Sequence, residues 1–349
     1  MKRFFLMFLK CALYGLAFAA MFCVGVALVV TVTFWCLVEP GESPGDEEEI
    51  APFVETWTAG VRDESANKVV RIDITGEIGP PAPSPLDDLL GGALGDEKGK
   101  DVPNEARKRI QYAREDESVK GLYLVFDTPG GDLTDSDLIW HDVRRFREAQ
   151  PGRFVLAHVL AQCCSGGYYV ASASDFIMVL PTSVVGSIGV ISDYGYNVAG
   201  LANRFGVTNI VVTTGVHKDA FNPMRPVDAR QVAIEQALVD KQFERFVQIV
   251  AEGRKMSVEK VRALADGRVY AASDAVEKGL VDAVGYPDEA LAKLEELAGG
   301  DVHMVEYDRT PEIEPSLIGK LLGGKLNVLH HPFTRRRNGV PVPRLRLVR

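Results

Sequence analysis

The segment 121–126 constrains the fold of this chain more than any other part of its sequence. It is an almost unbroken apolar run. Such a run is typical of a strand in a parallel sheet that other elements cover on both faces. Pro129, Gly130 and Gly131 follow it, and then comes a segment, about 135–148, with the pattern of a helix. We therefore expect a strand, a tight turn and a helix in succession.

The same alternation continues along the chain. Further strands are expected at 69–74, 154–160, 176–180 and 210–212, and further helices at 104–117, 165–173, 228–252, 258–265, 273–278 and 288–297. The segment 76–100 is rich in Gly, Pro and Asp, which predicts a long loop. Alternating strands and helices imply right-handed crossovers and a layered α/β fold.

Composition and charge narrow the class of protein. The 349 residues are 46% hydrophobic and carry a net charge of −9, which supplies a large core and argues against nucleic-acid binding. The tail 334–349 is rich in arginine and has no acidic residue, so it suits either anionic lipid or simple exposure to solvent. The five cysteines lie in one apolar segment or side by side at 163–164, where bridges are disfavoured, and we expect free thiols.

An uncharged apolar run covers residues 11–38, after Lys2, Arg3 and Lys10. As a helix it would be about 42 Å long, enough to cross a bilayer. Basic residues before it predict a cytoplasmic N-terminus (1–10) and an extracytoplasmic remainder, on the periplasmic side in a Gram-negative bacterium. The alternative is a signal peptide cleaved near Ala19, but the apolar run continues well beyond that point. An acidic, turn-rich linker is expected at 39–66.

Ser165 lies where an expected strand ends and an expected helix begins. Gly166 and Gly167 follow it, and glycines let another backbone approach closely. Taken alone, Ser-Gly-Gly is ordinarily a helix N-cap. The pair Gly130 and Gly131, however, follows a neighbouring strand and can aim backbone N–H groups at a developing oxyanion. The two turns together offer a hydroxyl and N–H donors at one sheet edge, as acyl transfer requires.

Lys218 is the candidate base. It lies in the segment 214–219, which has few competing charges. A serine that gives its proton to a neutral lysine is a nucleophile for acyl transfer, and this chemistry needs no metal or cofactor. A loop lysine is ordinarily a surface charge, so desolvation must keep the amine neutral. Adjacent Asp219 would oppose that if its carboxylate faced the ammonium group.

Other reactive side chains are weaker candidates. His158 lies inside an apolar strand and is expected to be a core histidine with satisfied hydrogen bonds. Cys164 is a second candidate nucleophile, but the residue before the turn would normally point into the core. The His, Cys and Asp residues show no spacing typical of a metal site.

Five motifs occur in a fixed order between about residues 69 and 285. They are Asp-Thr-Pro-Gly-Gly at 127–131, Ser-Gly-Gly-Tyr-Tyr at 165–169, Val-Gly-Ser-Ile-Gly-Val at 185–190, Gly-Val-His-Lys-Asp at 215–219 and Asp-Gly-Arg-Val-Tyr at 266–270. This region resembles the signal peptide peptidase (protease IV) family of serine endopeptidases. The resemblance implies a ClpP/crotonase-like layered β-β-α fold, here at 67–300, with a C-terminal strand and basic tail at 301–349 and the transmembrane helix at the N-terminus.

The resemblance also implies roles for particular residues. Ser165 would be the nucleophile, Lys218 the general base, and Ser187 the residue that orients that lysine. The oxyanion hole would use the backbone of Gly166 and of the turn at Gly130 and Gly131, with the choice between those two left open. No cofactor or metal is implied.

The same family relationship implies partners. We expect a homo-oligomeric ring whose active sites are shared between protomers, held at membrane lipid and acting on apolar peptides such as signal-peptide remnants. The chain departs from the family pattern at Cys163-Cys164 and at Asp127-Thr128. Two alternatives remain: a crotonase-like acyl-CoA enzyme, which would leave Lys218 and the anchor without a role, and a non-catalytic membrane ring scaffold.

Overall fold

The computed structural model describes residues 53–80 and 102–309. The predicted anchor at 11–38, the start of the linker, most of the loop expected at 76–100, and the basic tail lie outside the described residues. Among the helices that the structure describes, none combines the length and the apolar character needed to cross a membrane.

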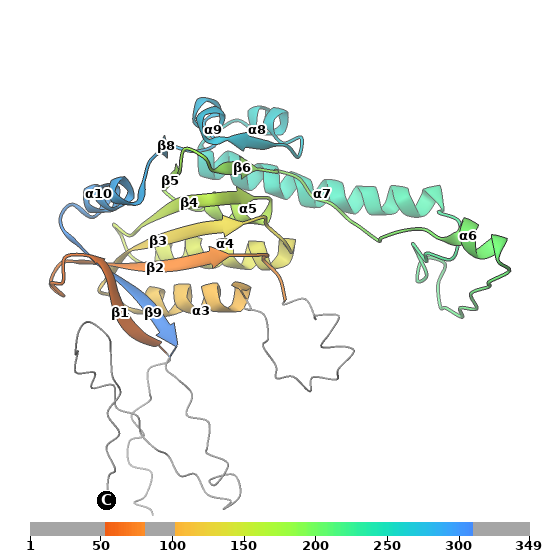
Figure 1. Ribbon diagram of the computed structural model, residues 1–349, viewed down its shortest axis with the longest axis horizontal. Helices are drawn as coiled ribbons and strands as arrows, with labels where there is room; N and C mark the ends of the chain where they lie inside the picture. The colour runs from red at the N-terminus through yellow and green to blue at the C-terminus, as the bar shows by residue number, and fades with distance from the viewer. Residues whose placement is uncertain (1–52, 81–101, 310–349) are drawn as a thin grey trace, which may run out of the picture. The chain divides into compact units, whose positions relative to one another are not determined.

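A nine-stranded sheet forms the centre of the described chain (Figure 1). Its main path runs in the order β1 (Phe53–Gly60), β9 (Val302–Arg309), β2 (Asn67–Thr75), β3 (Val119–Thr128), β4 (Phe154–Cys164), β5 (Phe176–Val179) and β8 (Ala283–Val284). Strand β6 (Val184–Gly186) pairs with β4 and with β7 (Val269–Ala271). From β9 to β8 the path is parallel, and β1 is antiparallel to β9.

Strand β3 is covered on both faces, as its apolar run predicts. On one face Leu122 and Phe126 belong to the larger hydrophobic core, together with side chains of α3 (Val102–Glu115) and α4 (Leu133–Ala149). On the other face Tyr123 and Val125 pack in a second core with Ala290 of α10 (Pro287–Ala298). The mixed α/β architecture is therefore confirmed, whereas the ClpP/crotonase-like assignment stays a prediction.

The remaining helices lie after β4. They are α5 (Gly166–Ala171), α6 (Ala199–Arg204), α7 (Ala229–Arg254), α8 (Val258–Leu264) and α9 (Ala272–Lys278). The C-terminal part of α7 packs on the core, where the rings of Phe246 and Tyr169 of α5 lie 5.0 Å apart. Each helix expected from the sequence in the described residues is present with slightly shifted ends.

One expected strand is wrong. Residues 210–212 form no strand, and Ile210 and Val212 are 89% and 95% exposed. A β-branched run forms a strand only when another strand lies beside it, and none of the strands in the described residues does so here. The sequence interpretation also gave no strand at β1, which falls inside the segment assigned to the linker, or at the short strands β6, β7 and β8.

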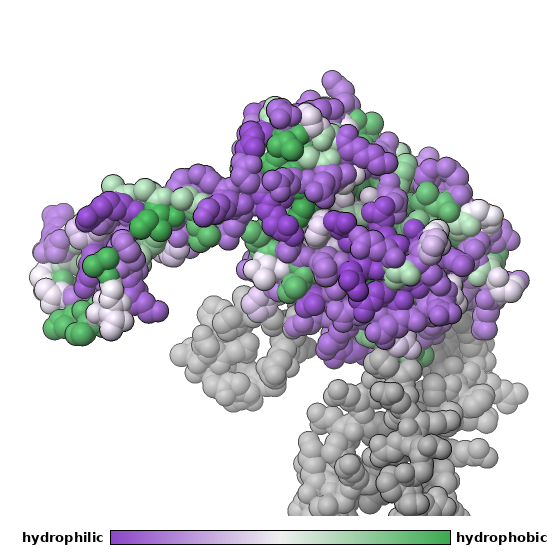
Figure 2. Space-filling view, turned by 180° about the vertical axis from the view of Figure 1, so that it is seen from behind, coloured by the Kyte–Doolittle hydropathy of each residue, from purple (hydrophilic) through white to green (hydrophobic). Residues whose placement is uncertain are grey.

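Residues 191–242, which we call the arm, differ from the rest of the described chain. The arm comprises α6, the loop after it and the first half of α7, and Figure 1 shows it extending beyond the sheet. Only Ala199 and Ala202 of the arm are buried. Large apolar side chains along it are instead exposed, among them Tyr196 (91%) and Phe205 (73%). Figure 2 shows such hydrophobic residues on its surface.

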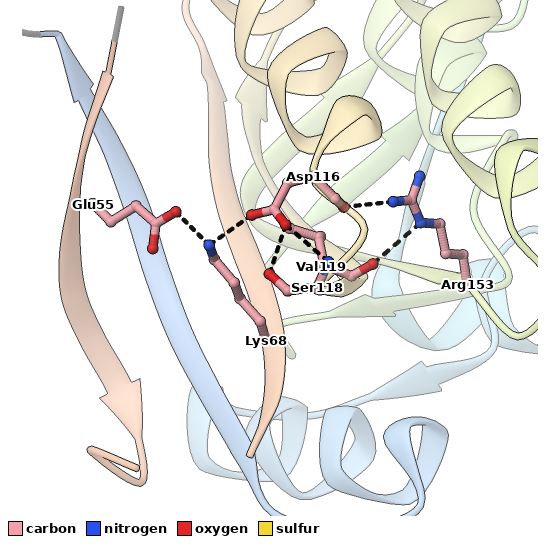
Figure 3. A network of polar contacts seen from close by, with 6 residues as sticks. All are labelled: Glu55, Lys68, Asp116, Ser118, Val119 and Arg153. Atoms are coloured by element: carbon pink, nitrogen blue, oxygen red, sulfur yellow. Dashed lines mark hydrogen bonds and ion pairs between the residues drawn. The ribbon is translucent and has the colours of Figure 1, made fainter. Parts of the chain in front are cut away.

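A polar network fastens the first strand to the sheet (Figure 3). Lys68 of β2 forms ion pairs with Glu55 of β1 and with Asp116, 2.8 Å away. Burial opposes the charge on Lys68, but the hydrogen bonds to the two carboxylates outweigh it and raise the lysine pKa. Arg153 donates to the backbone oxygens of Asp116 and Val119. The network thus ties β1, β2 and the end of α3 to the start of β3.

Candidate active site

The carboxyl ends of three neighbouring strands, β3, β4 and β6, lie at the same end of the sheet, which we call the sheet edge. Strand β4 lies between β3 and β6, with Thr128 paired to Cys163 and Cys164 paired to Gly186. The Ser165 N–H then donates to the Gly186 oxygen at 2.8 Å. Because the three strands are parallel, the turns that follow them lie side by side. The candidate residues at 130–131, 165–166 and 187 are thereby brought together.

Ser165 has an unusual backbone conformation. It is the N-cap of α5 with φ 48° and ψ −121°, and its side chain makes no capping hydrogen bond. A non-glycine residue with positive φ at this point costs on the order of 1–3 kcal/mol, and such strain is concentrated at functional sites. The sharp strand-to-helix turn resembles in kind the turns that expose a nucleophile at the end of a sheet. Ser165 is therefore held as a half-buried hydroxyl at the sheet edge.

The turn after β3 packs directly on Ser165. A Cβ atom at Gly130 would lie 2.7 Å from the Ser165 Cβ and 2.7 Å from the Gly166 nitrogen, so only glycine fits. Gly130 is buried, and its N–H donates to Thr128 Oγ1 at 3.1 Å. Gly131 is exposed, and within the described residues no hydrogen bond engages its N–H. Of the two glycines, Gly131 has the available donor.

Gly166 supplies a second N–H at the same place. As the first residue of α5 its N–H has no partner within the helix. An ideal Cβ at Gly166 would lie 3.4 Å from the Gly131 nitrogen and 2.2 Å from Ser136 Oγ. Buried Ser136 donates to the Asp132 oxygen in the first turn of α4. Ser136 thus fills the space beside Gly166, and the amides of Gly131 and Gly166 are neighbours at this turn.

Ser187 follows the strand that receives the Ser165 N–H. Its φ is 50°, and its own N–H donates to the Arg268 oxygen at 2.8 Å. Because Gly186 accepts from the Ser165 N–H, the residue that follows β6 stands beside the turn at Ser165. Ser187 is half-buried there.

Lys218 is not brought to this edge. It is an exposed residue of the arm, in the loop between α6 and α7. Helix α7 contacts α5 through Phe246, and the start of α7 at Ala229 lies about 26 Å from there along the helix axis. The carboxylate of Asp219 is paired with Arg225 at 2.8 Å and accepts from Asn222 at 2.9 Å. Asp219 is therefore occupied by groups other than the lysine.

The rival nucleophile and base are both buried. Cys163 is fully buried and Cys164 is 6% exposed, and burial raises the pKa of both thiols, which keeps them protonated and poorly nucleophilic. His158 has both ring nitrogens engaged, Nδ1 by Tyr123 Oη at 2.6 Å and Nε2 by the Gly285 oxygen at 3.2 Å. It is a core histidine, as predicted.

Sequence reasoning missed two side chains at this edge, Thr128 and Ser136. Thr128 stands out in the sequence only as a departure from the family pattern, and Ser136 belongs to none of the five motifs. Their contacts are with main-chain atoms and glycines, so neither carries a motif of its own. A small polar residue placed directly before a Pro-Gly-Gly turn was the available signal.

Comparison with known proteins gives a consistent picture. A sequence model of peptidase family S49 matches residues 147–301. The chain is 36% identical to a putative signal peptide peptidase SppA of Enterococcus faecium, over 57% of each protein. It is 35% identical to the putative protease MJ0651 of Methanocaldococcus jannaschii, over 55% of this chain and 61% of that one. For the putative protease slr0021 of Synechocystis the identity is 35%, over 60% of this chain and 74% of that one. The chain thus spans about three-fifths of the first two relatives.

Proposed function

Because the chain belongs to peptidase family S49, we propose that it is a serine endopeptidase that forms an acyl-enzyme on Ser165, with Lys218 of a neighbouring copy as general base. One observation carries the proposal. A strained, half-buried serine adjoins two neighbouring backbone amides, those of Gly131 and Gly166. A hydroxyl beside paired N–H donors is what attack on a carbonyl requires.

The proposed reaction has two halves. The neutral Lys218 amine takes the proton from Ser165 Oγ, the oxygen attacks the scissile carbonyl, and the carbonyl oxygen becomes an oxyanion between the Gly131 and Gly166 N–H groups. The ammonium then protonates the leaving amine as the C–N bond breaks. Water attacks the ester in the same way, its proton passing to Lys218 and back to Ser165. Loss of one oxyanion donor typically costs about 10²–10³-fold in rate.

Two observations support a base from another copy. Lys218 lies on the arm, away from the Ser165 turn of its own chain. The arm also exposes apolar side chains that a soluble monomer would be expected to cover, including Tyr196, Phe205 and Val212. A second copy that covers the arm would remove water from Lys218 and favour its neutral form. Ser187, beside the nucleophile turn, would hydrogen-bond and orient the incoming amine.

The proposal extends to the substrates and the location of the protein. We propose apolar peptides, such as signal-peptide remnants, and a domain held at the membrane by a helix at 11–38 on the extracytoplasmic side. Support comes from that uncharged run and from the relative of Enterococcus faecium, whose name describes a signal peptide peptidase.

Mixed oligomers test the shared site. Ser165→Ala and Lys218→Ala should each be inactive alone on a fluorogenic apolar peptide. Co-expressed in equal amounts, they should recover about a quarter of wild-type activity, because random assembly joins an intact serine to an intact lysine at that fraction of interfaces. A Cys164→Ala variant, with its thiol replaced beside the serine, is the control and should stay active.

Three results would contradict the proposal. An inactive mixture from active wild type would place both groups in one chain. Wild type that neither cleaves peptides nor reacts at Ser165 with a fluorophosphonate would indicate a non-catalytic assembly. Acyl-CoA turnover that survives Ser165→Ala would indicate a crotonase-like enzyme.

A further inference from the structure

The turn after β3 is held by one buried side chain that the proposed reaction does not use. Thr128 is fully buried at the end of β3. Its Oγ1 donates to the Gly76 oxygen at 2.5 Å and accepts from the Gly130 N–H at 3.1 Å. A hydroxyl has one hydrogen to donate, and the Thr128 hydroxyl donates it to the Gly76 oxygen, just after β2. The same oxygen accepts from the Gly130 N–H and so holds the turn after β3.

Two hydrogen bonds hold Gly130, whose C=O belongs to the peptide unit that carries the Gly131 N–H. The Gly130 N–H is bound to Thr128, and the Gly130 oxygen accepts from the Ile78 N–H at 2.8 Å. In a trans peptide the C=O of one residue and the N–H of the next point in opposite directions. Since the Gly130 oxygen points at Ile78, the Gly131 N–H points away from Ile78. The hydrogen bond from Ile78 therefore sets the direction of this amide, and Thr128 holds the preceding Pro129–Gly130 peptide.

The methyl group of Thr128 touches the other turn. An ideal Cβ at Gly167 would lie 2.5 Å from Thr128 Cγ2, so the methyl group occupies the space beneath the first turn of α5. The Gly166 N–H, the second amide of the site, belongs to the residue just before. One side chain thus contacts the neighbours of both amides, Gly130 by hydrogen bonding and Gly167 by packing.

We propose that Thr128 is a positioning residue for the oxyanion hole. Its hydroxyl holds Gly130, and through that residue places the Gly130–Gly131 peptide so that the Gly131 N–H faces the reacting carbonyl oxygen. Its methyl group sets the distance to the Gly166 turn. Thr128 itself touches no substrate. The inference rests on the proposed peptidase function and on Gly131 as a donor.

Two substitutions separate the hydroxyl from the methyl group. Thr128→Val keeps the branched shape and removes both hydrogen bonds, whereas Thr128→Ser keeps the hydroxyl and removes the methyl group. We expect Thr128→Val to lower kcat by about 10–100-fold with KM within twofold, because a misdirected donor weakens transition-state binding only. Thr128→Ser should keep kcat within about threefold of wild type. Both are measured as assembled, full-length protein.

The inhibition constant of a transition-state analogue distinguishes a positioning role from a purely structural one, because only a positioning role predicts that it changes in step with kcat. A peptide aldehyde forms a tetrahedral adduct with Ser165, so its inhibition constant should rise in Thr128→Val by the same factor as kcat falls. KM for the parent peptide should stay unchanged. If Thr128→Val fails to assemble, Thr128→Cys is compared with Thr128→Ser, because both lack the methyl group and differ only in the strength of the hydrogen bond. The cysteine variant should then have the lower kcat.

The outcomes are distinct from those that test the function. With wild type active, a valine variant within twofold of wild-type kcat would overturn the positioning role, as would serine and valine variants impaired equally. A parallel rise of KM in Thr128→Val would also overturn it, because that pattern indicates general damage. Wild type without peptidase activity would instead overturn the proposed function, and the role of Thr128 with it.

Discussion

The sheet edge and the arm, which together would supply the reacting groups, are built in opposite ways. At the edge, Thr128, Gly130 and Ser165 have their backbone positions determined by buried contacts and main-chain hydrogen bonds. Along the arm only two alanines are buried, and large apolar side chains face outward. Folding of one chain therefore completes the nucleophile side of the proposed site. The base side would be completed only by assembly.

This contrast predicts different consequences of damage in the two regions. A change at the sheet edge should alter chemistry without altering assembly. A change on the arm should act through assembly, and so should depend on protein concentration.

Lys218→Arg tests the arm at its proposed reactive group, with the largest expected effect. Arginine keeps the positive charge but cannot give up its proton at accessible pH, so kcat should fall by about 10³-fold or more. Oligomer size, measured by light scattering, should not change. Lys260→Arg, at an exposed lysine of α8, is the matched control and should keep full activity. Substantial turnover by Lys218→Arg would remove this lysine as the base.

Val212→Asp tests the arm as a contact surface. Val212 is 95% exposed in the single chain, so a charge there should leave the fold intact while opposing burial against another copy. We expect activity at low protein concentration to fall by about tenfold and to recover as concentration rises. The measurement is activity alongside sedimentation velocity.

The control for the arm is Val54→Asp, at a 44% exposed valine of β1 outside the arm. It should change neither assembly nor activity. An unchanged sedimentation coefficient for Val212→Asp would show that this part of the arm lies outside any interface.

The smallest expected effect is on the stability of the folded chain outside the arm, and it comes from His158. Burial lowers the pKa of His158, so the unfolded chain binds a proton more readily than the folded one. This contribution to stability is present above the unfolded pKa of about 6.5 and is lost as pH falls below it. Urea midpoints between pH 7.5 and pH 5 should fall in wild type, and less steeply in His158→Gln. Equal slopes would contradict the assignment.

The sequence predicted best those features that depend on neighbouring residues in the chain. The apolar run at 121–126 correctly indicated a strand covered on both faces, because burial on two faces leaves no polar alternation. The glycine turns at 130–131 and 165–166 were also located correctly, since close backbone approach excludes a Cβ atom. Placing these turns side by side needed only the parallel order of the strands.

Features that depend on contacts with residues distant in the sequence were either missed or predicted wrongly. The hydroxyl of Thr128 binds the Gly76 oxygen 52 positions away, and nothing in the local sequence reveals that contact. The β-branched run at 210–212 has the composition of a strand but lies on the arm without a neighbouring strand. The position of Lys218 relative to Ser165 within one chain depends on the length and direction of α7, and its role as base stays a prediction.

The pairing of β1 with β9 has a consequence for how the central sheet could be anchored. Phe53, the first described residue, is paired with Arg309, the last. The polypeptide therefore enters and leaves the sheet at adjacent points. A tether that fixes the start of β1 in space therefore also fixes the end of β9. Labels attached at Phe53 and Arg309 should then lie at the same distance from the point where the tether is anchored.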